Sequence, residues 1–406
     1  MSEDSIELRD VCSLIKRGIT PKYGENGLVV VNQRCIRNGV IELMNARIHD
    51  IVQRKVNAEK ILVKDDILVN STGVGTAGRV GMWIDSVAAT CDTHVTIIRP
   101  LADRINPTFL FYFLRNMEDV LHDSAEGSTG QTELKRETIG AINTPCFRMS
   151  EQEIIAQVLC SLDDKIDLLK RQNKTLEGMA EALFRQWFIE EAQDDWEETS
   201  FEHLIEKTIG GDWGKEQPID DFESECICIR GTDIADYAKG IPANAPTRYL
   251  KKSKVSKTQV RHGDVVMETS GGTDNQSTGR TLLFSSKASP LFSSTLVFSN
   301  FCRLIRPKHP EFGTFLHYFI KYLLDKKYLF NLENGTSGIK NLDYKTLLFF
   351  EKFPLPGDDR VFEFHEKTSP QLDKVIANKI EVRNLEKQRD TLLPKLMSGE
   401  VRVQMD

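Results

Sequence analysis

The feature that most constrains the fold is an internal repeat. Val63–Gly73 returns as Arg261–Gly271, with Asp66 aligned to Asp264 at an offset of 198 residues. Three further pairs of segments repeat in the same order: Ile98–Pro100 and Ile305–Pro307, Thr108–Leu114 and Thr314–Ile320, and Gly127–Gly130 and Gly335–Gly338. A repeat of roughly 200 residues is a duplicated domain rather than a solenoid unit. Two similar but unequal copies suit a two-part, asymmetric target.

The bulk composition is that of an ordinary globular protein. The 406 residues suffice for about two to four domains with their own cores. The net charge of −7 argues against a protein that coats nucleic acid by overall charge. Because no long apolar run or apolar leader is present, we expect no membrane span and no signal peptide.

The cysteine pattern argues against a metal site. Only Cys226 and Cys228 lie close together, and a lone C-x-C pair is a poor zinc signal. The scattered cysteines are those expected of reduced thiols in a cytoplasmic protein. We therefore expect a cytoplasmic chain that holds no metal.

Each copy is expected to begin with a mixed α/β part. The predicted strands are short β-rich runs bounded by Gly, Asn and Asp: Leu28–Val31, Ile67–Asn70, Thr93–Ile98, Val265–Thr269 and Leu296–Phe298. One helix per copy is predicted, at Pro107–Met117 and at Phe312–Leu324.

A long helix is predicted to follow each mixed part. From Ile155 to Trp187 the mostly apolar positions step by four and three, which is a heptad seam. Ser150 and Glu153 form a capping box at its start. The expected helix-pairing residues are Leu162, Ile166, Leu169, Asn173, Leu176 and Leu183 in the first helix, and Val375, Asn378, Val382, Leu385 and Leu392 in the second. In the second helix Arg389 interrupts the seam.

Two prolines are expected to limit the second helix. Ser369-Pro370 should start or break it, since proline fits a first turn but not a helix interior. Pro394 should kink or end it.

The two seams are expected to pair antiparallel as a coiled coil. Facing Asn173 to Asn378 also sets apolar residues opposite each other on both sides, such as Leu169 opposite Val382. Polar seam residues commonly fix register at some cost in stability. The alternative is that each helix packs on its own domain.

These expectations define an α+β fold with a pseudo-two-fold internal repeat. Two mixed α/β domains, residues 1–149 and 191–365, are separated by two long antiparallel coiled-coil helices, residues 150–190 and 366–406. The acid-rich stretch Glu190–Glu198 is interpreted as the linker between the copies.

Motifs that suggest catalysis are incomplete. Gly73–Gly78 fits G-x-G-x-x-G, but Arg79–Ile84 after it is typical of a strand, whereas a dinucleotide site needs a helix. Asn106–Phe109 is similar to an amino-methyltransferase motif without its second proline, and better fits a helix start. The phosphate-loop, zinc-protease and serine-hydrolase motifs are missing. The chain therefore shows no chemistry of its own.

Two ordered sets of motifs carry a family resemblance. They are Gly18–Tyr23, Lys64–Leu68 with its counterpart His262–Val266, Ser150–Ile154, and Leu392–Glu400. With these motifs the chain resembles the specificity subunit of Type I restriction–modification systems over nearly its whole length. Lys64-Asp65 departs from the usual His/Lys-Gly, and the second copy offers only Ile209–Asp212 at its start, which leaves that start open.

The resemblance implies a non-catalytic DNA-binding subunit. Each recognition domain would recognise one half of a split, asymmetric site on double-stranded DNA. The helices would hold the domains apart and dock two methyltransferase subunits, which carry S-adenosylmethionine and methylate adenine. Motor–nuclease subunits are implied as further partners, and no cofactor is expected on the chain itself.

Candidate DNA-binding residues are polar or basic and lie on expected loops. Base edges are recognised by such side chains, while lysine and arginine hold phosphates. Thr247–His262 is densely basic and contains no acid. The candidates are Lys22, Tyr23, Arg79, Gln131, Lys251, Lys252, Lys254, Lys257, Arg261, Gln276, Arg280 and Lys340.

Two other function classes stay open at this point. One is a diverged DNA methyltransferase or nuclease with its own active site, which binding of S-adenosylmethionine by the chain alone would reveal. The other is a coiled-coil adaptor that binds only proteins, which salt-dependent DNA binding would exclude.

Overall fold

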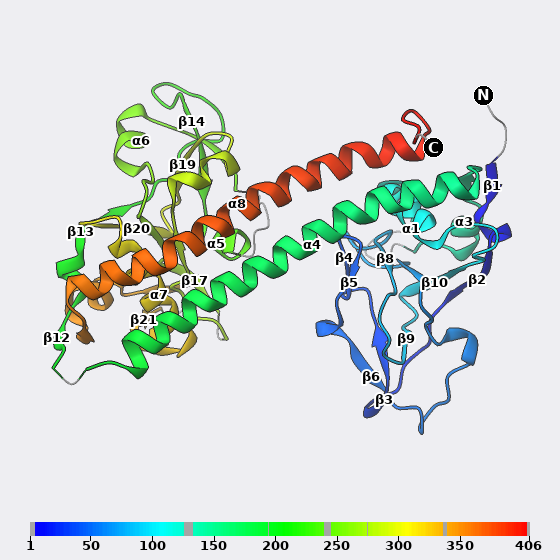
Figure 1. Ribbon diagram of the computed structural model, residues 1–406, viewed down its shortest axis with the longest axis horizontal. Coiled ribbons are helices and arrows are strands. Elements are labelled where there is room, and N and C mark those ends of the chain that lie inside the picture. Colours follow the sequence, from blue (N-terminus) through cyan, green and yellow to red (C-terminus); the bar gives the residue numbers. More distant parts are fainter. Residues whose placement is uncertain are drawn as a thin grey trace. The chain divides into compact units, whose positions relative to one another are not determined.

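The computed structural model divides the chain into two compact units (Figure 1). The structure describes residues 5–125, 133–193, 195–238, 245–273, 275–335 and 339–403. Unit 1 comprises Met1–Lys165 and Glu386–Asp406, and unit 2 comprises Ile166–Leu385. The boundaries fall inside the two longest helices, α4 (Met149–Arg185) and α8 (Asp358–Met397). Among the described residues no helix is both long and apolar enough to cross a membrane.

Unit 1 is built on two small sheets. A four-stranded antiparallel sheet has the order β2 (Cys12–Arg17), β10 (Val95–Pro100), β7 (Ile67–Asn70), β8 (Val80–Met82). A three-stranded sheet has the order β6 (Arg47–His49), β3 (Tyr23–Val31), β9 (Ala89–Cys91), with β3 and β9 parallel. The other elements are β1 (Ser5–Glu7) with β11 (Asn143–Pro145), β4 (Ile36–Arg37) with β5 (Val40–Ile41), α1 (Pro107–Asn116), α2 (Glu118–Asp123) and α3 (Arg136–Gly140).

Unit 2 repeats the topology of the four-stranded and three-stranded sheets. Its four-stranded sheet has the order β13 (Ile205–Gly210), β20 (Cys302–Pro307), β16 (Val265–Glu268), β18 (Thr281–Leu283). Its three-stranded sheet has the order β15 (Thr247–Leu250), β14 (Ser224–Ile229), β19 (Thr295–Phe298), again with one parallel pair, β14 and β19. The other elements are β12 (Glu197–Thr199) with β23 (Phe353–Leu355), β17 (Ser270–Gly272), β22 (Lys340–Leu342) and β21 (Glu333–Asn334) in one sheet, α5 (Gly231–Ala238), α6 (Lys252–Thr258) and α7 (Phe312–Asp325). The α+β fold with an internal repeat is therefore confirmed.

The sequence patterns explain why the central elements form. All four residues of β7 are buried, as are all four of β16, so these strands form the core of each sheet. In α1 the Asn106 side chain accepts a hydrogen bond from the Phe109 amide, and Pro107 occupies the first turn, as predicted. The glycine-rich loop after β7 leads into strand β8 and not into a helix.

A buried ion pair explains one repeated motif in each copy. Arg99 donates from Nε and Nη2 to the Asp66 carboxylate at 2.7 and 2.8 Å. Arg306 does the same to Asp264 at 2.9 and 2.6 Å. Each aspartate also accepts a hydrogen bond from the backbone amide of the residue three positions before it. The repeated aspartate and arginine are therefore structural in both copies, because they fasten the loop before β7 or β16 to the neighbouring strand.

A glycine after the first strand of each four-stranded sheet aligns the two copies. A Cβ at Gly18 would collide with the Cys91 carbonyl, and a Cβ at Gly211 would collide with the Ser299 carbonyl. In each copy the next residue donates its amide to a carbonyl of the three-stranded sheet, Ile19 to Cys91 and Asp212 to Phe298. Gly211 is therefore the structural counterpart of Gly18.

The prediction for the start of the second long helix was wrong. The helix begins at Asp358 and runs through both Pro370 and Pro394. Pro370 is exposed, so its ring lies outside the core. Because proline has no N–H, the carbonyl of Glu366, itself an exposed residue, lacks its helical donor. The turns on either side are held by buried residues such as Phe364 and Val375. Packing on both flanks outweighs the local cost of the proline.

The acidic linker is also partly structured. Its last residues, Glu197 and Glu198, begin β12, which pairs with β23. This pair stands where β1 and β11 stand in unit 1. The sequence does not predict this strand, because both glutamate side chains are exposed and give no alternation of apolar and polar residues.

We predict that breaking the buried ion pair of unit 2 destabilises the protein strongly. Arg306→Met leaves the Asp264 carboxylate buried without its partner, and the free energy of unfolding should fall by about 3 to 5 kcal/mol. Arg171→Met, which removes an exposed ion pair with Asp167, should cost less than about 1 kcal/mol. Urea denaturation of the two variants checks this, and equal stability would contradict it.

Candidate nucleic-acid interface

The long helices pair through a seam that contains an asparagine layer. Within unit 2, Asn378 donates from Nδ2 to the Asn173 Oδ1 at 2.9 Å and to the Gln172 Oε1 at 2.8 Å. Ile166 and Leu169 of α4 form one apolar cluster with Val382 and Leu385 of α8. Earlier residues of α4 thus meet later residues of α8, so the segments run antiparallel. The structure places the two asparagines in contact, in the register expected from the sequence.

The other predicted pairing residues lie on or beside this seam. Val375 is buried and Leu176 is half-buried. Leu183 packs against the main core of unit 2, and Leu392 packs against the core of unit 1. Leu162 is half-buried in unit 1. The α4 helix begins at Met149, so Ser150 lies in its first turn and not at the cap.

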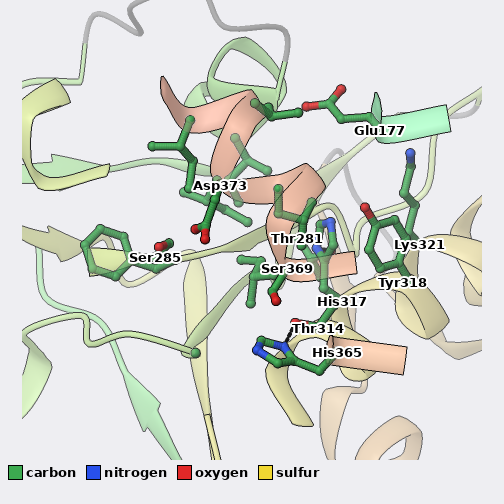
Figure 2. A pocket seen from close by; sticks show the side chains of 18 of the residues that line it. Glu177, Thr281, Ser285, Thr314, His317, Tyr318, Lys321, His365, Ser369 and Asp373 are labelled. Atoms are coloured by element: carbon green, nitrogen blue, oxygen red, sulfur yellow. Dashed lines mark hydrogen bonds between the residues drawn. The ribbon is translucent and has the colours of Figure 1, made fainter. Parts of the chain in front are cut away.

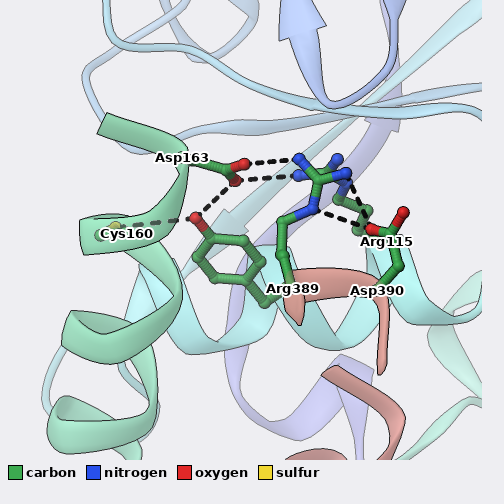
Figure 3. Close-up of polar contacts among 6 residues, drawn as sticks. Arg115, Cys160, Asp163, Arg389 and Asp390 are labelled. Carbon is green, nitrogen blue, oxygen red and sulfur yellow. Dashed lines mark hydrogen bonds and ion pairs between the residues drawn. The ribbon is translucent and has the colours of Figure 1, made fainter. Parts of the chain in front are cut away.

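A polar network replaces the seam at its interruption in unit 1 (Figure 3). Asp163 of α4 accepts from Arg389 of α8 at 2.6 Å, from Arg115 of α1 at 3.0 Å and from the Tyr112 hydroxyl at 2.8 Å. Burial alone would raise the pKa of the Asp163 carboxyl, but the two arginines lower it below its usual value. Asp163 of α4 therefore links α8 to α1, and its ion pair with Arg389 explains the gap in the apolar seam.

We predict that the asparagine layer fixes register at a cost in stability. Asn173→Leu alone removes one acceptor from buried Asn378 and should lower the free energy of unfolding by about 1 to 3 kcal/mol. The double variant Asn173→Leu with Asn378→Val copies the Leu169–Val382 contact and should be at least as stable as the natural chain. A double variant less stable than the single one, in urea denaturation, would contradict this.

In unit 1 the candidate DNA-binding residues lie at two places. Lys22 and Tyr23 are exposed at the start of β3. Arg79 lies before β8 and donates to the Gly75 carbonyl at 3.0 Å, within the glycine-rich loop. Gln131 lies outside the described residues.

In unit 2 the predicted basic run forms α6 and its flanks. Lys251 pairs with Asp221 at 2.9 Å and Lys254 with Asp212 at 3.6 Å. Lys252 and Lys257 are exposed, and among the described residues no carboxylate pairs with either. Arg261, after the helix, is also exposed. The run therefore contains both paired and available cations.

The three other candidates of unit 2 differ in exposure. Arg280 donates from Nε to the Glu268 carboxylate at 2.8 Å, and Glu268 is only 2% exposed. Lys340 is half-buried, lies 3.4 Å from the Thr273 carbonyl and pairs with Glu333 at 3.7 Å. Gln276 is exposed. The interpretation of these residues as DNA contacts stays a prediction.

An arginine that the sequence did not reveal occupies equivalent positions in the two copies. In unit 1, Arg17 of β2 lies opposite Thr96 of β10 and donates to the Leu134 carbonyl. In unit 2 the arginine sits on the other strand, as Arg303 of β20 opposite Gly210, and it stacks on Tyr344. Because the arginine lies on different strands in the two copies, a linear alignment does not match Arg17 with Arg303. The equivalence is visible only from the pairing of the strands.

Unit 2 also contains a cavity of about 260 Å³ between β18, α7, α8 and α4 (Figure 2). His317 and His365 line it, and each ring Nδ1 lies within hydrogen-bond distance of a threonine hydroxyl, at 2.9 Å from Thr281 and 2.8 Å from Thr314. Burial lowers the pKa of His317 to about 4, helped by Lys379. A histidine that is neutral at pH 7 offers no charge to a phosphate, so His317 is not a candidate phosphate contact.

We predict that the available lysines of α6 contribute most to DNA binding of the assembled complex. Neutralising Lys251, Lys252, Lys254 and Lys257 should weaken binding without changing the target. Lys252→Gln with Lys257→Gln should flatten the log–log salt dependence by about one unit for each phosphate that is no longer neutralised. The matched pair Lys251→Gln with Lys254→Gln should change it less, because those lysines already have carboxylate partners. Equal slopes for both pairs would contradict this.

Known proteins with similar sequences are specificity subunits. The chain is 26% identical over 332 residues to the Type I restriction enzyme MjaIX specificity subunit of Methanocaldococcus jannaschii, covering 74% of this chain and 71% of that protein. It is 24% identical to the Type I restriction enzyme HindI specificity subunit of Haemophilus influenzae, covering 95% of this chain and 98% of that protein.

A solved structure shares the fold. The Type-I restriction-modification system S subunit from M. genitalium matches with a TM-score of 0.55 and 15% sequence identity, over 99% of this chain and 96% of that chain. At this identity the likeness concerns the fold alone.

Two copies of one α/β domain, each completed by segments of the same two long helices, define a DNA-recognition subunit with two recognition domains. The family model described as Type I restriction modification DNA specificity domain matches residues 3–178, which span the first recognition domain and most of α4. Residues 3–178 thus match the family model, and the chain is similar to Type I restriction–modification specificity subunits over most of its length.

Proposed function

We propose that this specificity subunit recognises a split, asymmetric site on double-stranded DNA, one half through each unit. The observation that carries the proposal is a duplicated fold with unequal surfaces. The strand order is identical in the two copies, yet the basic helix α6 occurs only in unit 2 among the described residues. Identical surfaces would select a palindrome, whereas unequal ones select two different half-sites.

The subunit is proposed to work without catalysis of its own, in the cytoplasm. Two methyltransferase subunits would dock on it, bring S-adenosylmethionine and methylate one adenine in each half-site. Motor–nuclease subunits are proposed as additional partners that cleave unmodified DNA. This division of labour fits the context of the G-x-G-x-x-G motif, whose glycines lie in a loop between two strands and do not open a helix.

Methylome sequencing tests the proposal directly. Cells that carry this chain with its cognate methyltransferase should show methylated adenines in two different half-sites at a fixed spacing. Cells with the methyltransferase and no specificity subunit should lack that pattern. An undivided target, or one independent of this chain, would overturn the proposal.

We predict that the purified chain binds no S-adenosylmethionine and transfers no methyl group to DNA. The only residue similar to a methyltransferase motif, Asn106, caps α1 through its side chain and is thereby occupied. Isothermal titration with the cofactor and a methyl-transfer assay check this. Methyl transfer that persists through purification and is lost in Asn106→Ser, which keeps a helix cap, would show an active site in the chain.

A further inference from the structure

An exposed arginine of unit 1 is stacked on an exposed aromatic ring. The Arg47 guanidinium carbon lies 3.4 Å from the centroid of the Tyr23 ring. Arg47 is on β6 and Tyr23 is on β3, and the two strands pair antiparallel in the three-stranded sheet. Tyr23 lies opposite His49, two residues along β6 from Arg47, so the two side chains come from neighbouring strands.

The stacked arginine is available to a partner. Arg47 is exposed, and Tyr23 is 41% exposed. Among the described residues no carboxylate pairs with the Arg47 guanidinium, in contrast to Arg99 or Arg115 of the same unit. Stacking on a ring holds the planar guanidinium in one orientation while its N–H edge stays in solvent.

The second copy has the same kind of stack in a closed form. Arg248 lies on β15, which is the counterpart of β6. Its guanidinium carbon lies 4.1 Å from the Trp213 ring centroid. Arg248 is only 8% exposed, and it pairs with Glu216 at 2.9 Å. The arrangement is thus structural in unit 2, and only in unit 1 is the arginine edge presented to solvent.

We propose that Arg47, oriented by Tyr23, recognises a guanine in the half-site bound by unit 1. The inference rests on the proposed function, since it names a base contact of that same DNA-binding unit. A fixed guanidinium edge matches O6 and N7 of guanine in the major groove, the commonest specific contact between a side chain and a base. The same fork can bind a phosphate in a bidentate way, so a change in the recognised base, and not a loss of affinity alone, identifies the base contact.

The test compares the methylated targets of four variants in the complete complex. Arg47→Ala and Arg47→Lys should both relax one G·C position of one half-site, with discrimination there falling about 5- to 150-fold. Lysine keeps the charge but not the planar fork, so a loss shared by both variants identifies recognition by the fork. Tyr23→Ala should relax the same position to a smaller extent, whereas Tyr23→Phe, which keeps the ring face, should not.

Two controls separate the possible failures. Arg171→Ala removes an exposed arginine of α4 that pairs with Asp167, and it should leave the target unchanged. The proposed function fails if the natural chain directs methylation to no split target at all. The Arg47 inference alone fails if the natural chain has a split target and Arg47→Ala keeps it unaltered. It also fails if Arg47→Ala only weakens DNA binding and flattens its salt dependence, which would identify a phosphate contact.

Discussion

The antiparallel pairing of α4 and α8 is the interaction on which the rest of the structure depends. Unit 1 consists of the first 165 residues together with the C-terminal end of α8, and unit 2 takes in the later part of α4. Leu393 and Leu396 of α8 complete the core of unit 1, while Phe184 and Phe188 of α4 complete that of unit 2. Neither copy can bury its core without a helix segment from the other copy. The register of the helices at Asn173 and Asn378 therefore decides which segments of α4 and α8 belong to each unit.

The two copies share their buried contacts and differ in their exposed side chains. The ion pairs of Asp66 with Arg99 and of Asp264 with Arg306 are the same in geometry, and so are the tight approaches at Gly18 and Gly211. The exposed positions differ: the stacked arginine is available in unit 1 and closed in unit 2. Buried positions are constrained by packing, whereas exposed loops are free to diverge and carry specificity. A split target follows naturally from such a molecule.

Much of this architecture was predictable from the sequence, because repeats and periodicity are local signals. The strand of Ile67–Asn70, the cap at Asn106 and the contact of Asn173 with Asn378 all follow from pattern. The errors arose where distant packing decides. Helix α8 continues through Pro370, and the equivalence of Arg17 and Arg303 is visible only from strand pairing. The DNA contacts stay predictions, since side chains on loops depend on geometry that one sequence does not contain.

The central proposal is that the length of the helix pair sets the spacing between the two half-sites on DNA. Deleting Ile166–Gln172 together with Lys379–Leu385 removes one heptad from each helix, and it keeps both the asparagine layer and the Asp163 network. At 1.5 Å per residue the deletion shortens the pair by about 10 Å, or about three base pairs. The most direct measurement is the methylated target of this variant with its methyltransferase. The account predicts unchanged half-sites with a spacer about three base pairs shorter; an unchanged spacer would contradict it.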